Sequence, residues 1–344
     1  MKISGQSKFN PTRKASLQNL IQASLPNNNS PVFIYSEDAL RKNVESYKTG
    51  INSLKATARL NFSIKSNFNP EIIRRLLTFG VDGLTTVSGA ELRLATTLGV
   101  CGPNIVFNGN GKTSVEIRNA ISSDCLINVD SQFDFDQISD ACQDVGKKAN
   151  VLIRINPNID PCVHEYNTTA SGKACKFGVI QSDIELIAQQ ISLNKHLNLR
   201  GIHCHLGSTI DKLDPIKTCA ARLKQILQRI IQYIDGNPIV NVGGGLGIKY
   251  DKSIAELPSP IDYISCFSNF DDVANVEIIF EPGRSLVGNT AILVGTVIGI
   301  KNDRILVTDM SMTECIRPAL YAAHHHVSLT REATKERANL PKIC

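Results

Sequence analysis

Short apolar segments alternate with helical patterns along most of this 344-residue chain, and this alternation limits its possible folds more than any other feature. Short apolar runs bounded by turn residues are typical of buried strands. Eight such runs predict strands at Ala58–Ile64, Gly83–Thr86, Asn104–Phe107, Leu126–Val129, Asn150–Ile155, Leu199–Cys204, Ile239–Val242 and Val276–Phe280. Between them, helical spacing of apolar residues predicts helices at Pro70–Phe79, Gly89–Leu98, Ser114–Ile121, Ser131–Val145, Ser182–Leu193, Pro215–Ile234 and, less regularly, around 260–270.

A chain that alternates strand and helix builds a parallel sheet, because each helix carries the chain back to the start of the next strand. Eight such units over roughly 240 residues favour a closed (β/α)8 barrel of the TIM type. A doubly wound open sheet is the alternative. We therefore assign the chain to the α/β class and expect a barrel.

Both ends of the chain depart from this alternation. A short strand at Val32–Tyr35 comes first, and strands at Ala291–Ile300 and Arg304–Thr308 follow the last barrel unit without a helix between them. We expect the tail to pair with the first strand. Residues 1–36 and 289–344 would then form a second β domain, beside a barrel of residues 37–288.

The first 36 residues contain no Asp or Glu, as in a transit peptide. We favour a short amphipathic helix here, because Leu17, Leu20, Ile21 and Leu25 recur at helical spacing.

The composition excludes several classes of protein. The net charge of +5 is spread along the chain, and Trp is absent, so we expect no nucleic-acid partner. No run of apolar residues is long enough to cross a bilayer, so we expect no membrane association. The ten cysteines form no CxxC pair, and several lie in apolar segments, which indicates reduced thiols in a cytoplasmic protein.

Residues able to do chemistry follow the predicted strands. In a barrel enzyme the active site lies at the carboxyl ends of the strands. The residues at or just after those ends include Lys65, Ser88, Asn108-Gly-Asn-Gly111, Asp130, Arg154, Asn156, His205 with Ser208, Gly243-Gly-Gly245, and Glu281 with Arg284. This pattern predicts one polar rim.

Three features of the rim indicate a cofactor. Lysine forms Schiff bases with carbonyl groups, including the aldehyde of pyridoxal phosphate, although Lys65 alone could be a solvated strand end. The glycine turn that begins at Gly243 lacks the dinucleotide spacing G-x-G-x-x-G, so a monophosphate is the better interpretation. A carboxylate such as Glu281 can keep a pyridine nitrogen protonated, and Arg284 could clamp a carboxylate or a phosphate.

The histidines do not predict a metal site. We expect His203 and His205 to point in opposite directions, one toward the barrel and one toward the helix layer, so they would not share a metal. We expect His203 to be an ordinary core histidine and His205 to face the flat cofactor. The run His324-His-His326 is interpreted as a loop, because adjacent side chains diverge.

Taken together, the motifs resemble those of the fold-type III, pyridoxal-phosphate-dependent (PLP-dependent) amino-acid decarboxylases, and within them the diaminopimelate decarboxylases. The resemblance runs from about Pro31 to the last residue, with the motifs in family order. They are Ile64-Lys-Ser-Asn67, Val87-Ser-Gly-Ala-Glu-Leu92, Phe107-Asn-Gly-Asn-Gly-Lys112, Arg154-Ile-Asn-Pro157, Lys176-Phe-Gly178, His203-Cys-His-Leu-Gly-Ser208, Val242-Gly-Gly-Gly245, Glu281-Pro-Gly-Arg284 and Arg317-Pro-Ala-Leu-Tyr321.

The resemblance implies a role for each matching residue. Lys65 would hold the cofactor covalently, and His205 would stack on its ring. The remaining cofactor contacts would be Glu281 at the pyridine nitrogen, and Ser208 with Gly243, Gly244 and Gly245 at the phosphate. Arg284, Arg317 and Tyr321 would hold carboxylate or phosphate groups, with Cys344 as proton donor across a homodimer interface. The implied reaction converts meso-diaminopimelate into L-lysine and CO2.

Two departures from the family pattern stand out. Thr85 and Thr86 lie where the family has an Asp at the end of the second strand. The chain stops at Cys344, where the family continues with Glu-Ser, so the β domain would be truncated and the dimer weakened. Two alternatives follow: a truncated relative that binds PLP or a longer partner without catalysis, and a related decarboxylase with another substrate. A racemase of the same barrel type fits less well, because such enzymes pair the pyridine nitrogen with a cation.

Overall fold

The computed structural model describes residues 30–161, 163, 175–250, 256–302, 304–329 and 342–343. The chain divides into two compact units, one of residues 37–248 and 257–288, the other of residues 1–36, 249–256 and 289–344. Each unit is described by itself. The predicted N-terminal helix and Cys344 lie outside the described residues.

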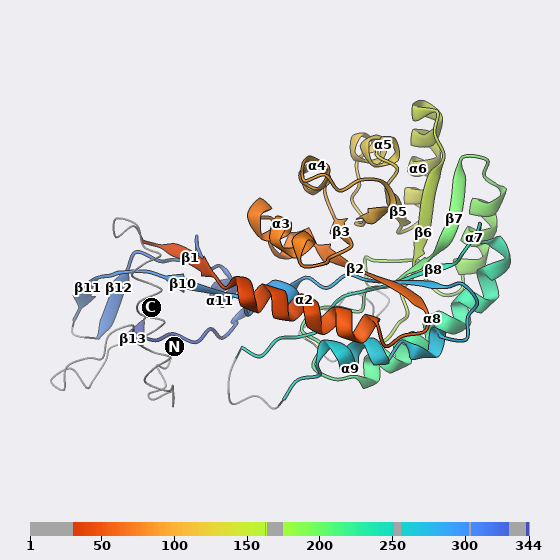
Figure 1. The fold of residues 1–344 in the computed structure, drawn as a ribbon. Coiled ribbons are helices and arrows are strands. Elements are labelled where there is room, and N and C mark those ends of the chain that lie inside the picture. The colour runs from red at the N-terminus through yellow and green to blue at the C-terminus, as the bar shows by residue number, and fades with distance from the viewer. Residues whose placement is uncertain are drawn as a thin grey trace. The chain divides into compact units, whose positions relative to one another are not determined.

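The larger unit is a closed barrel of eight parallel strands (Figure 1). Each strand pairs with the next, and β9 returns to pair with β2, which closes the barrel. The strands are β2 (Thr57–Ser63), β3 (Gly83–Thr86), β4 (Ile105–Phe107), β5 (Leu126–Val129), β6 (Ala149–Arg154), β7 (Leu197–His203), β8 (Ile239–Gly243) and β9 (Glu277–Phe280). The predicted barrel is confirmed, and the open sheet is excluded.

Most helices of this unit connect successive strands, while one precedes the first strand of the barrel and one follows the last. Helix α2 packs along α9, α5 along α6, and α7 against α8. Their bounds are α2 (Glu37–Ile51), α3 (Pro70–Thr78), α4 (Gly89–Thr97), α5 (Ser114–Ser122), α6 (Gln132–Val145), α7 (Ile184–Leu193), α8 (Asp214–Ile230), α9 (Pro260–Ser265) and α10 (Arg284–Val287). Several begin at side-chain caps, such as the capping box that Thr113 and Glu116 form at α5.

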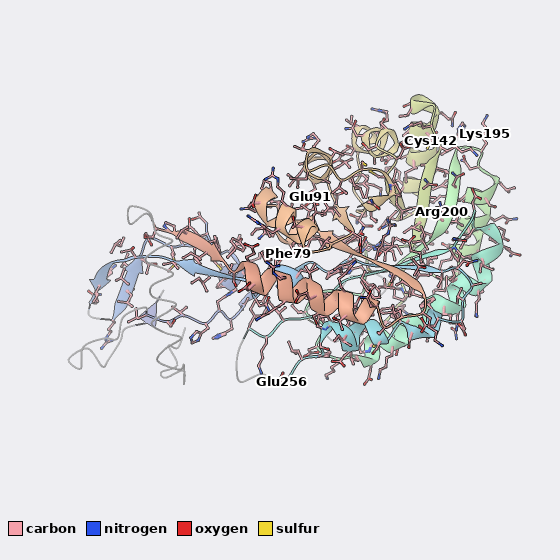
Figure 2. The ribbon with its side chains drawn as sticks, viewed as in Figure 1. Phe79, Glu91, Cys142, Lys195, Arg200 and Glu256 are labelled. Carbon is pink, nitrogen blue, oxygen red and sulfur yellow. The ribbon has the colours of Figure 1, made fainter. Side chains whose placement is uncertain are left out.

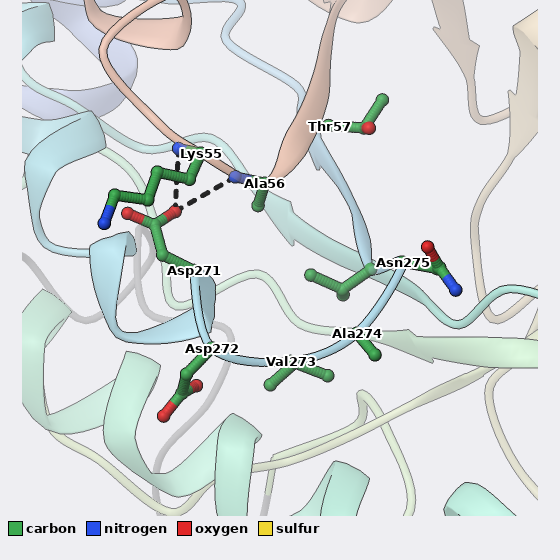
Figure 3. Close-up of a pocket in the computed structure, with 9 residues that line it drawn as sticks. Lys55, Ala56, Thr57, Asp271, Asp272, Val273, Ala274 and Asn275 are labelled. Atoms are coloured by element: carbon green, nitrogen blue, oxygen red, sulfur yellow. Dashed lines mark hydrogen bonds between the residues drawn. The ribbon is translucent and has the colours of Figure 1, made fainter.

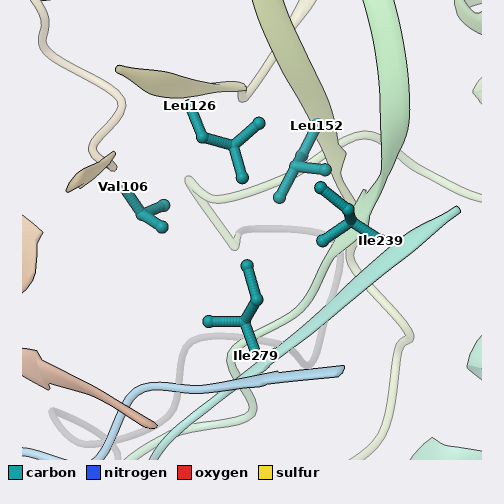
Figure 4. Close-up of a cluster of buried hydrophobic side chains, with 5 residues drawn as sticks. All are labelled: Val106, Leu126, Leu152, Ile239 and Ile279. Atoms are coloured by element: carbon teal, nitrogen blue, oxygen red, sulfur yellow. The ribbon is translucent and has the colours of Figure 1, made fainter. Parts of the chain in front are cut away.

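Five apolar side chains from five strands point toward one another inside the barrel (Figure 4). They are Val106, Leu126, Leu152, Ile239 and Ile279, each no more than 6% exposed. Such burial contributes roughly 1.5–3 kcal/mol per side chain relative to exposure. This apolar layer fills the interior of the barrel, and it lies below the carboxyl ends of the strands, where barrel enzymes bind their ligands.

A polar layer lies one step above this apolar layer. Successive strand side chains alternate in direction, so residues two positions on point the same way. Two positions after the five apolar residues come Asn108, Asn128, Arg154, Asn241 and Glu281, all buried. The barrel interior therefore changes from apolar to polar at the end where the strands finish.

The smaller unit contains two sheets. Strand β1 (Val32–Tyr35) pairs antiparallel with β10 (Ala291–Val294), as predicted. Strands β11 (Val297–Lys301), β12 (Ile305–Thr308) and β13 (Lys342–Ile343) form the other sheet, and α11 (Arg317–Tyr321) is a short helix. The prediction of a single strand at Ala291–Ile300 is wrong, because strand pairing is interrupted at Gly295–Thr296. There, Thr296 N donates a hydrogen bond of 2.8 Å to Asp309 Oδ1.

Among the described residues, no helix is both long and apolar enough to cross a membrane.

Candidate active site

Glu281 lies at the centre of the polar layer, just after β9. Its side chain is 4% exposed. Oε1 accepts hydrogen bonds from Thr85 Oγ1 and Asn241 Nδ2, both at 2.7 Å. Oε2 accepts one from Asn108 Nδ2 at 3.1 Å. Donors from the carboxyl ends of β3, β4 and β8 thus fix one carboxylate.

The environment keeps this carboxylate ionised. Burial alone would raise the pKa of Glu281, but His203, Asn241 and Thr85 outweigh burial and lower that pKa. Hydrogen bonds to the charged form of a carboxyl group favour ionisation. Glu281 can therefore present a negative charge to a cationic group at the barrel mouth.

Lys65 lies in a short 3-10 turn, Ile64–Ser66, that caps β2. The turn packs on the chain around Glu281: Ser63 N donates to Pro282 O over 3.1 Å, and Ser63 Oγ donates to Glu281 O over 2.9 Å. A Cβ on Gly283 would lie only 3.0 Å from Ser66. These contacts hold Lys65 at the carboxyl ends of neighbouring strands.

The surroundings of Lys65 lower the pKa of its amine and so favour the neutral form. Its side chain remains accessible to solvent at the barrel mouth. Although part of the side chain is open to solvent, the surrounding protein atoms desolvate the amine and lower the pKa of Lys65. The charge of Arg154 lowers it further. Glu281 and Glu91, which lies on α4 (Figure 2), oppose this shift. A lysine with a lowered pKa is the nucleophilic form needed for attack on an aldehyde.

Arg154 faces the same region from the end of β6. Its guanidinium pairs with Asp130 Oδ1 at 3.2 Å and lies over the ring of Phe177 at 4.2 Å. Asp130 Oδ2 also accepts from Gly178 N at 3.1 Å. Below it, Lys112 pairs with Asp134 at 2.6 Å, and both side chains are almost fully buried. Four charges, two of each sign, thus line one side of the barrel.

The glycine turn after β8 allows a close approach of two backbones. Gly243 has φ +66°, and a Cβ there would lie 2.6 Å from Cys204 O. A Cβ on Gly244 would lie 2.5 Å from Glu281 O, and on Gly245, with φ +120°, 2.4 Å from Gly207 O. No residue with a side chain fits these positions without a shift, so the loops after β7, β8 and β9 meet through bare backbone.

His205, Ser208 and Arg284 lie beside this turn. His205 Nδ1 accepts a hydrogen bond from Gly244 N at 3.3 Å. Arg284 Nε donates to Ser208 Oγ over 3.2 Å. Burial, followed by the charges of Lys65 and Arg154, lowers the pKa of His205 well below its usual value, so the imidazole is neutral at neutral pH. The structure therefore brings together Lys65, His205, Ser208, Gly243–Gly245, Glu281 and Arg284 in one unit.

The expected orientation of the two histidines is wrong. Residues two apart on a strand share a face, so His203 and His205 point the same way. His203 lies inside the barrel, with Nε2 3.5 Å from Glu281 Oε2. The intervening Cys204 points to the helix layer, where its Sγ lies 3.7 Å from Cys219 Sγ on α8. His203 is also less ordinary than expected, because neither ring nitrogen has a hydrogen-bond partner among the described residues.

Arg317 and Tyr321 belong to the smaller unit. Both lie on α11, where the Arg317 guanidinium is 4.5 Å from the centre of the Tyr250 ring. Arg317 Nη1 lies 3.3 Å from His325 Nε2. Their part in binding stays a prediction, as does that of Cys344.

A pocket also lies at the opposite ends of the strands (Figure 3). Asp271 accepts from the backbone of Lys55 and Ala56 there, at 3.0 and 3.1 Å. The pocket is lined by residues 55–57 and 271–276, and none of the polar groups described above at the carboxyl ends lines it. In barrel enzymes the active site lies at the carboxyl ends of the strands, which is where Lys65 and Glu281 lie.

Comparison with known proteins identifies the family to which the barrel belongs. The model of the pyridoxal binding domain of pyridoxal-dependent decarboxylases matches residues 38–288. The chain belongs to this family. Its match spans the whole barrel, including Lys65 and Glu281.

Individual members of the decarboxylase family are similar over most of this chain. A probable chloroplastic diaminopimelate decarboxylase from Oryza sativa is 37% identical over 304 residues, which are 87% of this chain and 61% of that relative. The diaminopimelate decarboxylase of Aquifex aeolicus is 33% identical over 90% of this chain and 72% of its own length. The structure of the Helicobacter pylori enzyme complexed with L-lysine superposes with TM-score 0.82 at 30% identity, over 90% of this chain and 76% of that one.

The residues present fit the cofactor of a pyridoxal-dependent family. The amine of Lys65, whose pKa is lowered, suits an aldehyde. The buried, ionised carboxylate of Glu281 suits a pyridine nitrogen. The glycine backbone and the adjacent pair of Ser208 and Arg284 suit a phosphate.

Asn241 and Asp134 were not singled out from the sequence, and Thr85 was noted there only as a departure from the family pattern. Asn241 lies two positions after Ile239 on β8, so strand periodicity alone predicts that its side chain points into the barrel.

Proposed function

We propose that this chain catalyses the PLP-dependent decarboxylation of meso-diaminopimelate to L-lysine and CO2. The observation that carries the reaction type is the ionised, triply hydrogen-bonded Glu281 at the barrel mouth. An anion at that point supports a protonated pyridine, which is the strong electron sink that loss of CO2 needs. The substrate rests on the diaminopimelate decarboxylases similar to this chain.

The proposed roles follow the geometry. Lys65 would hold the aldehyde, and His205 would contact the ring. Ser208 and the backbone of Gly243, Gly244 and Gly245 would hold the phosphate, together with Arg284. Glu281 would pair with the pyridine nitrogen. When bound, the cofactor accepts the electron pair that decarboxylation leaves at Cα.

The other steps belong to side chains of the protein. The lowered pKa of Lys65 favours the neutral amine, which is the form that can bond to an aldehyde. We propose that Arg317 and Tyr321 hold the substrate's carboxylate and that Cys344 returns a proton to Cα across a homodimer interface. These three assignments rest on the motif resemblance.

The homodimer and a cytoplasmic location are also proposals. The dimer is supported by the family resemblance of the motifs in the smaller unit. The cytoplasm is supported by the eight cysteines in the described part of the chain, because no two of them form a disulfide. Sedimentation of the purified protein at several concentrations tests the dimer.

A second candidate function is cofactor binding without turnover. It is favoured by the family match, which covers the pyridoxal binding domain, residues 38–288. The chain spans 61% of the length of the rice relative. The activity of the whole relative is therefore a proposal for this chain.

One experiment separates the two candidates. Purified protein supplied with PLP is given meso-diaminopimelate, L-ornithine or L-arginine, and CO2 and amine products are measured. Release of CO2 from meso-diaminopimelate, lost in Lys65→Ala, supports the proposed function. A visible absorbance band of bound cofactor without any CO2 release supports the second candidate, and turnover of only another amino acid contradicts the substrate.

A further inference from the structure

His203 is a buried imidazole to which none of the proposed roles applies. It is the last residue of β7 and is 1% exposed. Neither Nδ1 nor Nε2 has a hydrogen-bond partner among the residues that the structure describes. A buried polar side chain without a partner is costly, so its position calls for a function or a partner.

A carboxylate oxygen of Glu281 beside the ring accounts for the buried position of His203. His203 Nε2 lies 3.5 Å from Glu281 Oε2. A shortening of about 0.5 Å would give a normal hydrogen bond, and such contacts tighten when a site fills.

The two oxygens of Glu281 are held unequally. Oε1 accepts two short hydrogen bonds of 2.7 Å, from Thr85 and Asn241. Oε2 accepts one longer bond of 3.1 Å, from Asn108. Oε2 therefore keeps capacity for another donor, and it is the oxygen that His203 approaches.

Burial of His203 outweighs the charges around it and favours the neutral imidazole. Burial is the largest influence and lowers the pKa of His203, and Arg154 on β6 lowers it as well. Glu281 and Asp130 oppose this and raise it. A neutral imidazole carries one N–H, so it can donate from Nε2 to a carboxylate without adding a net charge to the barrel.

We propose that His203 is a positioning residue, which presents Nε2–H to Glu281 Oε2 and so keeps that carboxylate ionised and oriented toward the cofactor nitrogen. The proposal rests on the proposed function, in which Glu281 faces the pyridine nitrogen. It adds a residue that acts through Glu281 and touches neither the cofactor nor the substrate.

The first test measures cofactor binding in the absence of substrate. Apo-protein is titrated with PLP by absorbance, across a pH series, for wild type, His203→Gln and His203→Leu. The amide N–H of Gln can replace Nε2–H, whereas Leu only fills space. We expect His203→Leu to bind PLP about tenfold more weakly, the size of one hydrogen bond to a charged group, and His203→Gln to stay within about twofold of wild type.

The pH series distinguishes positioning from packing. Without the His203 donor the pKa of Glu281 rises, so the acidic pH range in which binding weakens extends upward in His203→Leu. Cys204→Ala is the matched control, because Cys204 lies on the same strand end but faces α8. We expect it to lower thermal stability without moving the pH profile.

The outcomes separate this inference from the proposed function. Equal affinity and equal pH profiles in wild type and His203→Leu overturn the positioning role, as does equal weakening by Leu and Gln. Absence of PLP binding by wild type overturns both proposals. Failure to release CO2 from meso-diaminopimelate, with PLP bound, affects only the proposed function.

A second measurement needs no cofactor. Nitrogen-15 NMR of the histidine side chains in apo-protein reports which ring nitrogen carries the proton. The proposal requires the Nε2-protonated tautomer of His203, and a change in its signal in Glu281→Gln. Protonation at Nδ1 alone contradicts it.

Discussion

Thr85 Oγ1 donates a hydrogen bond of 2.7 Å to Glu281 Oε1, joining the end of β3 to the residue that follows β9. The two residues are 196 positions apart in sequence. Thr85 stands in the neighbourhood where the family resemblance leads one to expect an Asp. Because a hydroxyl can donate to a carboxylate, the threonine stabilises the charge of Glu281 at this position.

Thr85→Val is expected to destabilise the protein by about 1–3 kcal/mol, because it leaves a buried carboxylate short of one donor at similar volume. The measurement is urea unfolding. Thr86→Val is the control, since Thr86 is equally buried but makes only a 3.4 Å contact with Val106 O. Equal losses in both variants would show that the Glu281 contact carries no special weight.

Lys112→Met is expected to cost about 3 kcal/mol, because it removes one partner of a buried ion pair and leaves Asp134 behind. Burial already raises the pKa of Asp134, although Lys112 opposes the shift. Arg229→Gln is the comparison, since its pair with Glu185 is half exposed and surface pairs contribute about 0–1 kcal/mol. A smaller loss for Lys112→Met than for Arg229→Gln would contradict this account.

Gly243→Ala is expected to weaken both folding and cofactor binding. Its φ of +66° disfavours any side chain, and the new Cβ would lie 2.6 Å from Cys204 O. Gly111→Ala is the matched control, because no atom lies within 4 Å of a Cβ built there. Thermal melting and PLP titration of both variants give the comparison, and similar behaviour would remove the case for a backbone cradle.

Mild acid is expected to destabilise the fold through its buried histidines. Burial lowers the pKa of His203 and His205 in the folded protein, while the unfolded chain keeps a value of about 6.5. The unfolded state therefore binds protons more readily, so stability is full above about pH 6.5 and falls as the pH drops toward the folded pKa values. Unfolding free energies between neutral and acidic pH measure this, and His203→Gln should make the dependence shallower. An unchanged dependence would contradict the buried neutral state of His203.

Much of the barrel follows from local sequence patterns. The predicted bounds of β3 and β5 match the structure residue for residue. Each strand is followed within two residues by a serine, Ser88 or Ser131, that caps the next helix, so neither strand can extend further. The placement of Lys65 and Glu281 at one end of the barrel follows from the rule that parallel strands all finish at the same edge. Strand order then needs only the chain sequence, since each strand pairs with the next.

The hydrogen-bond network could not be derived in the same way. Which side chains meet Glu281 depends on the registers of β3, β4 and β8 relative to β9, and these are set by packing across the whole barrel. The period of two along β8 places Asn241 inside the barrel, but it does not show that Asn241 meets Glu281. The error over His203 and His205 had a simpler origin, since the period of two already places both on one face. The break at Gly295–Thr296 depends on a contact with Asp309 that no local pattern reveals.

The most direct test of the central claim is to identify the lysine that holds the cofactor. Protein loaded with PLP is treated with borohydride, which reduces the bond between the aldehyde and the lysine, and is then digested and analysed by mass spectrometry. The account predicts the pyridoxyl group on Lys65, and no specific labelling in Lys65→Ala. Labelling of a different lysine, such as Lys112, or an unlabelled Lys65 in protein with bound cofactor, would contradict it.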